Sequence, residues 1–164
     1  MTKPSLRIGT RGSPLALAQS EQVRDRLGAV DPTPALEIEV IRTTGDAILD
    51  KPLAEIGGKG LFTKEIDTAL LDGRIDLAVH SMKDVPTEVA PGTVIACVLA
   101  REDPRDAWIS RHDGGLEGLP AGAVVGTASL RRGAQVLHRR PDVTVVPLRG
   151  NVGTRLDKVG RGEV

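Results

Sequence analysis

The sequence contains very few aromatic residues and a single cysteine. Phe62 and Trp108 are its only aromatic residues, and tyrosine is absent. A hydrophobic core would therefore consist of aliphatic side chains, for which an apolar content of 40% is sufficient. The lone Cys97 excludes an internal disulfide bond and indicates a reducing compartment. Because it lies within an apolar run, we expect it to be buried and inert in a strand.

The sequence also lacks an excess of charge of either sign and lacks long apolar runs. Lys and Arg together number 22, as do Asp and Glu, so the net charge is zero; a nonspecific nucleic-acid binder is usually basic overall. No apolar stretch is long enough to cross a bilayer, and the N-terminus has no signal-peptide core. His80, His112 and His138 do not have metal-ligand spacing. These features predict a cytoplasmic protein with no nucleic-acid partner, membrane span or metal site.

Strand-like and helix-like segments alternate along the chain. Strands are expected at 6–10, 36–43, 75–80, 93–100 and 107–110, helices at 15–27 and 61–71, a strand–helix–strand unit over 123–148 and a last helix from about 151. This alternation is typical of α/β domains with mostly parallel sheets. The charged segment 101–105 is a candidate domain boundary.

We therefore expect a first α/β domain over residues 1–100, with a lid loop at about 45–60, and the N-terminal part of a second over 101–164. The second domain lacks the elements needed to bury its last helix, so the chain is expected to be truncated.

Three junctions between a strand and a helix combine arginine with glycine or a small polar residue. They cover residues 8–14, 124–132 and 145–151, the last followed by Arg155. A helix N-terminus offers unpaired N–H groups and partial positive charge, and arginine adds a planar donor fork. Arg131, Arg132 and Arg155 oppose the dipoles of their helices, a conflict that an anionic ligand would relieve; the alternative is that they lie on solvated faces. The junctions predict a site for a ligand with several negative charges.

Two further segments carry polar or aromatic groups that could face a ligand. Lys83 and Asp84 follow an expected strand, and the carboxyl ends of parallel strands commonly line the ligand crevice. They could act as a base, a charge stabiliser or an ion pair; the alternative is a surface turn with two solvated charges. Phe62 follows the glycine-rich segment 57–60 and is either a core residue or a stacking platform for a flat ligand.

Five motifs are similar to those of the porphobilinogen deaminase family, also called hydroxymethylbilane synthases. They are residues 8–16 with Gln19, 57–62, 80–86, 126–132, and 148–152 with 154–156. Each motif alone is weak, but five in the correct order and spacing are specific, and together they cover essentially the whole chain. The resemblance implies a transferase that condenses four porphobilinogen molecules head to tail, with release of ammonia, to give the linear tetrapyrrole hydroxymethylbilane for haem biosynthesis.

The resemblance also implies an architecture and a cofactor. The family has three α/β domains, of which the first two resemble type II periplasmic binding proteins; the second is incomplete in this chain. The third, absent here, holds a covalent dipyrromethane through a cysteine, so Cys97 is not expected to be the anchor. The full-length protein is expected to be a monomer, and the fragment alone is expected to be inactive.

The residues that match the family motifs are expected to form a site for the carboxylates of that cofactor. Asp84 is implied as the catalytic acid that contacts pyrrole nitrogens. The implied carboxylate-binding residues are Arg11, Ser13, Lys83, Ser129, Arg131, Arg132, Arg149 and Arg155, with Thr127, Gly150 and Asn151 lining the same walls and Lys59 and Phe62 at the lid. The alternative function is a non-catalytic anion-binding module of the periplasmic-binding-protein type; the lack of a signal peptide and the presence of Asp84 among basic residues argue against it.

Overall fold

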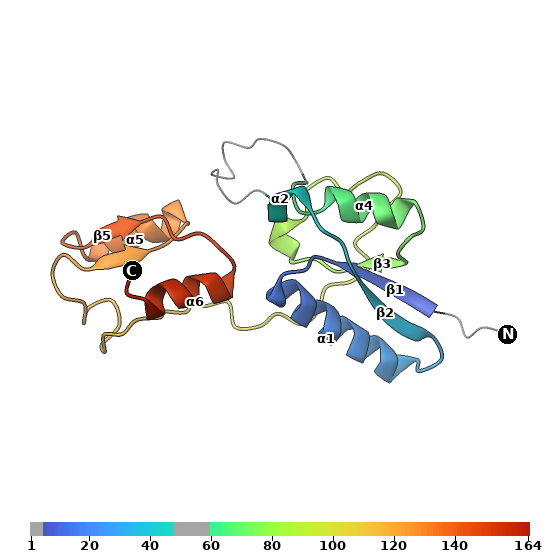
Figure 1. The fold of residues 1–164 in the computed structure, drawn as a ribbon, viewed down its shortest axis with the longest axis horizontal. Helices are drawn as coiled ribbons and strands as arrows, with labels where there is room; N and C mark the ends of the chain where they lie inside the picture. The colour runs from blue at the N-terminus through green and yellow to red at the C-terminus, as the bar shows by residue number, and fades with distance from the viewer. Residues whose placement is uncertain (1–4, 48–59) are drawn as a thin grey trace. The chain divides into compact units, whose positions relative to one another are not determined.

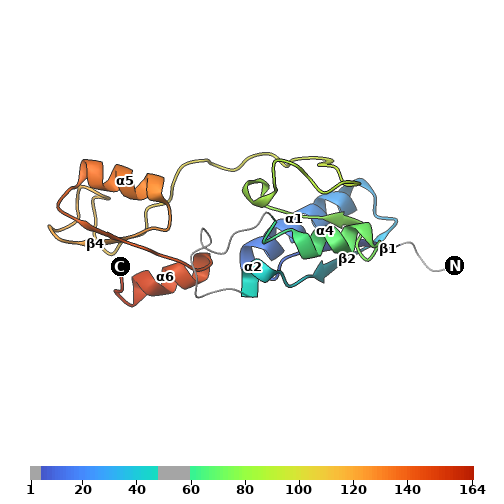
Figure 2. The same cartoon turned by 90° about the horizontal axis from the view of Figure 1, so that it is seen from above.

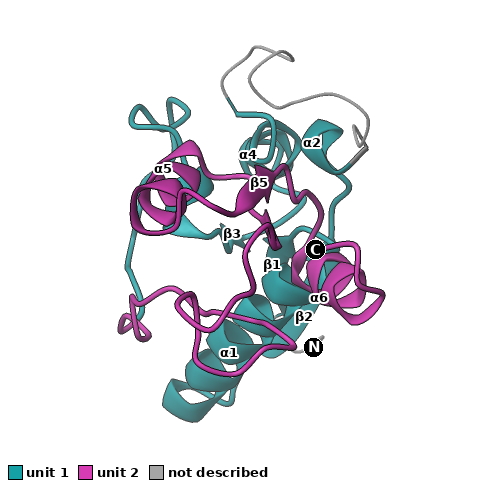
Figure 3. Cartoon of the chain, turned by 90° about the vertical axis from the view of Figure 1, so that its left-hand side faces the viewer, with its two compact units in different colours: residues 1–99 teal, residues 100–164 magenta. Residues whose placement is uncertain are grey.

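The computed structural model describes residues 5–47 and 60–164. The chain divides into two compact units, residues 1–99 and 100–164 (Figure 3). In both units the described strands pair in parallel. The expected α/β architecture with parallel sheets is therefore confirmed.

The first unit is built on a three-stranded sheet in the order β2–β1–β3. Strand β1 (Ser5–Thr10) pairs along its whole length with β2 (Ala35–Val40) and, over two residues, with β3 (Leu77–Ala78). As the central strand, β1 is covered on both faces, and its last three residues, 8–10, are buried. Because β1 and β3 are parallel, their carboxyl ends lie at the same edge of the sheet.

Two helices flank this sheet on opposite sides (Figures 1 and 3). Helix α1 (Pro14–Val30) begins at Ser13, whose hydroxyl accepts a hydrogen bond from the Ala16 amide at 3.3 Å. A proline as the first helical residue costs no hydrogen bond. The helix therefore begins within one residue of the start expected at residue 15. Helix α4 (Lys64–Leu71) covers the other side.

Helix α4 forms the core of the first unit with the segments that follow β2 and precede β3. Ile66 and Ala69 of α4 pack with Ile41 and Ile75, and all four side chains are buried. A Cβ atom on Gly9 of β1 would lie 2.2 Å from Cδ1 of Ile75. Only glycine at this position allows α4 and its core to approach the sheet so closely.

The second unit contains two short parallel strands and two helices. Its elements are β4 (Val124–Gly126), α5 (Leu130–Arg139), β5 (Thr144–Val146) and α6 (Val152–Gly160). Its buried core consists of Leu119, Val125 and Val143. No helix in the described part of the chain is long and apolar enough to cross a membrane.

The expected strands at 93–100 and 107–110 are wrong. The chain between β3 and β4 contains no strand and only the short 3₁₀ helix η1 (Met82–Asp84); Figure 2 shows its long irregular course in yellow-green to orange. The third expected strand is confined to Leu77–Ala78. A strand needs a neighbour to complete its hydrogen-bond ladder, and no described strand lies beside 93–100. Consequently Cys97, expected to be buried, is exposed.

Helix α2 (Thr44–Ala47) lies in the segment that was expected to be an irregular lid. It follows β2 after residues 41–43 and is followed by residues outside the described ranges. Thr43, which precedes it, is 1% exposed. The start of the expected lid is thus anchored to the core of the first unit.

Candidate functional site

Arg11 is the centre of a charged cluster in the first unit. It follows β1 directly, and its Nε lies 3.1 and 3.2 Å from the two carboxylate oxygens of Asp46, to which Nη2 also donates. Its Nη1 lies 3.7 Å from Oδ2 of Asp84, and its guanidinium lies 4.1 Å from the centre of the Phe62 ring. The cluster therefore joins the ends of β1 and β3 to α2 and to the segment before α4.

The carboxylate of Asp46 is held from a second side by Thr43. The Thr43 hydroxyl donates to Oδ2 of Asp46 at 2.8 Å and accepts from the Asp46 amide at 3.3 Å. Burial opposes the charged form of Asp46, but the hydrogen bonds from Arg11 and Thr43 outweigh it, so the pKa of Asp46 lies below its usual value. Asp46 is thus a fixed anion at neutral pH.

Asp84 is placed by η1 and its flanking bonds. Its amide donates to the Ser81 carbonyl at 2.9 Å, and the Ser81 hydroxyl donates to Gln19 of α1 at 3.0 Å. The Asp84 side chain is 25% exposed. Of the two charges expected to follow the third strand, Asp84 is partly enclosed and paired, whereas Lys83 is exposed.

His80 lies beside the same cluster. It is half-buried, and burial lowers its pKa, while the nearby charges of Asp67 and Asp84 act in the opposite direction and Arg11 lowers it further. The imidazole is therefore neutral at pH 7. Among residues 5–47 and 60–164, no group of three or more His, Cys, Asp or Glu side chains could hold a metal ion.

In the second unit, the expected site residues lie at the N-termini of α5 and α6. The Ser129 hydroxyl accepts from the Arg132 amide at 3.3 Å, and Oδ1 of Asn151 accepts from the Thr154 amide at 2.9 Å. Thr127 accepts from the Ser129 amide at 3.2 Å. Each cap satisfies one of the free amides of its helix and leaves others for a ligand.

Arg132 and Arg155 at these helices have protein partners. Arg132 donates through Nε and Nη2 to the carboxylate of Asp106, at 2.8 and 2.6 Å. This hydrogen-bonded pair raises the pKa of Arg132 and lowers that of Asp106. Arg155 donates to the Gly150 carbonyl at 2.8 Å, and Gly150 has a φ of +117°, which favours glycine.

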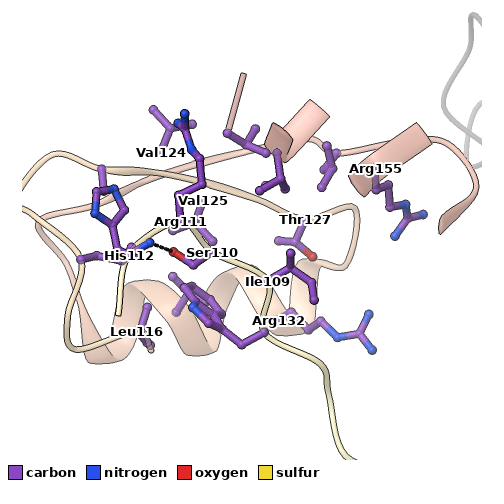
Figure 4. A pocket seen from close by; sticks show the side chains of 18 of the residues that line it. Ile109, Ser110, Arg111, His112, Leu116, Val124, Val125, Thr127, Arg132 and Arg155 are labelled. Carbon is purple, nitrogen blue, oxygen red and sulfur yellow. Dashed lines mark hydrogen bonds between the residues drawn. The ribbon is translucent and has the colours of Figure 1, made fainter. Parts of the chain in front are cut away.

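A pocket of about 800 Å³ opens within the second unit (Figure 4). Thr127, Arg132 and Arg155 line it, and Figure 4 shows the two guanidinium groups toward the same end. Much of the remaining wall is apolar and includes Trp108 and Ile109. The pocket therefore contains only part of the expected carboxylate-binding set of this unit.

The structure brings together Arg11, Phe62 and Asp84 in the first unit and Thr127, Arg132 and Arg155 in the second. Of the other expected residues, three cap helices: Ser13, Ser129 and Asn151. Arg131 is exposed in the first turn of α5, and Arg149 is half-buried after β5. Lys59 lies outside the described residues. Phe62, for which a core or a stacking role was expected, has Arg11 over its ring.

Sequence reasoning missed Asp46 and Asp106. Asp46 lies in a run of small polar residues, 43–46, shortly after the parallel strand β2. This position near the carboxyl edge of a sheet is a signal for it. Asp106 lies near the charged segment that was interpreted as a domain boundary. Nothing in its local pattern indicates that it pairs with Arg132, which is 26 residues away.

The comparisons with known proteins agree on one family. A family model described as "Porphobilinogen deaminase, dipyromethane cofactor binding domain" matches residues 6–164. The chain is 61% identical over 163 residues to the chloroplastic porphobilinogen deaminase of Oryza sativa subsp. japonica, covering 97% of this chain and 46% of that protein. It is 58% identical over 171 residues to the porphobilinogen deaminase of Phenylobacterium zucineum, covering 99% of this chain and 53% of that protein.

The chain spans about half the length of the curated relatives that it matches. Their names favour a deaminase over a non-catalytic anion-binding module. Because the relatives from Oryza sativa and Pisum sativum are described as chloroplastic, the cytoplasmic location expected from the sequence stays a prediction.

Proposed function

Because the chain belongs to the porphobilinogen deaminase family, we propose that it supplies the N-terminal part of an enzyme that condenses four porphobilinogen molecules to hydroxymethylbilane with release of ammonia. The observation that carries this proposal is the position of Asp84. Its partly enclosed carboxylate lies beside Arg11 and follows a parallel strand, where ligands of α/β sheets bind. A pure anion receptor gains nothing from a carboxylate there.

The donor groups of the second unit suit the cofactor that the family binds. Arg131, Arg132 and Arg155 present guanidinium groups near the N-termini of α5 and α6, and guanidinium groups pair well with the acetate and propionate groups of a dipyrromethane. When bound, dipyrromethane supplies the primer to which pyrrole units are added. In this proposal the carboxylate-binding set is completed by Arg11, Ser13, Lys83, Ser129 and Arg149, and the same walls are lined by Thr127, Gly150 and Asn151.

Asp84 acts on the pyrrole nitrogens. A fixed carboxylate stabilises positive charge that develops on a ring N–H after ammonia leaves. The same oxygen atoms can accept a proton once the new carbon–carbon bond has formed. Arg11 keeps this carboxylate in place, and Phe62 and Lys59 contribute to substrate binding.

The finer assignments belong to the same proposal. The two units correspond to two domains of the type II periplasmic-binding-protein kind, the second incomplete in this chain. The full-length protein is a cytoplasmic monomer without a nucleic-acid partner, and residues 1–164 alone turn over no substrate.

The test is a chimera in which residues 1–164 are continued by the C-terminal part of the Phenylobacterium zucineum relative. Incubated with porphobilinogen, the chimera is expected to release a linear tetrapyrrole. The isolated chain is expected to release none and to show no added dipyrromethane mass. An inactive chimera beside an active intact relative would contradict the proposal.

A further inference from the structure

Three of the five N–H donors of Arg11 remain after its contacts with Asp46 are counted. Asp46 takes the Nε–H and one N–H of Nη2, and a guanidinium has five N–H groups. Nη1 keeps both of its hydrogens and faces Asp84 across 3.7 Å, an ion-pair distance that is too long for a hydrogen bond. Asp46 thus occupies one edge of the guanidinium and leaves the other directed at Asp84.

The guanidinium of Arg11 also lies over the Phe62 ring. The ring lies 4.1 Å from Cζ of Arg11, a distance typical of a cation over an aromatic face. The Phe62 ring is in turn fixed by Gly45, where an added Cβ would lie 2.3 Å from it. The ring therefore has no room to move toward α2.

The anchor of this arrangement is in the core. Thr43 is 1% exposed and holds Asp46 by two hydrogen bonds, at 2.8 and 3.3 Å. The side chains of Arg11 and Asp46 are only 21% and 24% exposed, so water weakens their pairing less than on an open surface. A chain of contacts therefore runs from buried Thr43 through Asp46 and Arg11 to Asp84.

We propose that Asp46 is a positioning residue, which acts through Arg11 to orient the carboxylate of Asp84. This inference rests on the proposed function, in which Asp84 contacts the pyrrole nitrogens. Arg11, Asp46 and Asp84 together carry one net negative charge. Such a group suits a positively charged or N–H-donating part of a ligand. Because Arg11 is shared between Asp46 and Asp84, its single positive charge does not fully neutralise Asp84.

The first test needs no enzymatic activity. NMR of the 164-residue chain is used to follow the Nε–H signal of Arg11, which a hydrogen bond protects from exchange with water. We expect a protected signal in the parent and in Asp84→Asn, and loss of protection in Asp46→Asn. The matched control is Asp76→Asn, which removes a similar pair because Asp76 accepts from Nε and Nη2 of Arg7 at 3.0 and 3.1 Å; it should leave the Arg11 signal unchanged. An unprotected signal in the parent would overturn the inference.

The second test measures tetrapyrrole formation by the chimera. Asp46→Asn is expected to lower kcat by about tenfold or more with a smaller change in KM, as for loss of a preorganised electrostatic partner. Asp76→Asn should leave kcat unchanged. Because Asp46 acts through Arg11, Arg11→Lys and the double variant Arg11→Lys/Asp46→Asn should have the same kcat.

A kcat for Asp46→Asn equal to that of the parent, or additive losses in the double variant, would overturn the positioning role. An inactive parent chimera would instead contradict the proposed function, and the NMR experiment would still decide whether Asp46 holds Arg11.

Discussion

At the scale of single residues, the arginines of both units lie mostly in pairs with carboxylates. Arg11 pairs with Asp46, and Arg132 with Asp106. A ligand carboxylate that reaches Arg132 must therefore share or displace Asp106. Because the Arg132–Asp106 pair is about half exposed, water screens the pair and this exchange costs little. The positive charges of Arg11 and Arg132 are thus already compensated by carboxylates of the chain itself.

Cys97 provides a residue-scale prediction. It lies in the segment after η1 that forms no strand, and its thiol is exposed. We expect Ellman's reagent to titrate one thiol per chain under native conditions at nearly the rate observed in urea, with Cys97→Ser as the blank. Reaction only after unfolding would show instead that the thiol is buried, as the sequence pattern suggested.

Sequence patterns identified the residues that resemble the family's motifs but not their partners. Arg11 and Asp84 are recognisable because each follows a strand pattern. Asp46 contacts Arg11 across 35 positions, and such a contact depends on the register of β1 with β2. A local sequence pattern does not show how β1 and β2 pair.

At the scale of elements, the starts of helices with a side-chain cap are predictable, whereas strand ends are not; α4, which has no such cap, begins at Lys64 and not at the expected residue 61. Ser13, Ser129 and Asn151 each accept a hydrogen bond from the amide three residues later, a local interaction that the sequence shows directly. The segments 93–100 and 107–110 have strand-like composition but no described strand partner. β-propensity describes how well a side chain fits a sheet. It therefore does not predict a strand where no neighbouring strand is available.

Gly9 provides an element-scale prediction. An alanine Cβ would lie 2.2 Å from Ile75, which is 1% exposed and has little room to move. Gly9→Ala should lower the free energy of unfolding by about 1–3 kcal/mol. The control is Gly28→Ala within α1, where the nearest atom is 3.5 Å away; it should be neutral or stabilising by up to about 1 kcal/mol. Urea unfolding measures both, and equal effects would contradict the close packing of α4 on β1.

At the scale of the whole molecule, the two units have separate cores and can differ in stability. His80 gives the first unit its own pH dependence. Because its folded pKa is lowered from 6.5, the unfolded state takes up a proton first as the pH falls. Its contribution to stability is present above about pH 6.5 and decreases as the pH falls toward the folded pKa.

Hydrogen exchange of the β1 amides at pH 7.5 and 5.5 measures this effect. After correction for intrinsic exchange rates, the opening free energy should be lower at pH 5.5 in the parent. The difference should shrink in His80→Gln and persist in His138→Gln, whose exposed imidazole lies on α5. The same difference in His80→Gln as in the parent would assign the pH dependence to another group.

The central claim is that the carboxylate of Asp84 performs the chemistry within a site that this chain builds. The most direct measurement is the single-turnover rate of porphobilinogen incorporation by the chimera and by its Asp84→Asn variant, both loaded with dipyrromethane and both checked for equal melting temperature. We predict an active parent and a variant slower by about 10²-fold or more. A variant that retains more than about a tenth of the parent rate, a difference of only about 1.4 kcal/mol, would contradict the account.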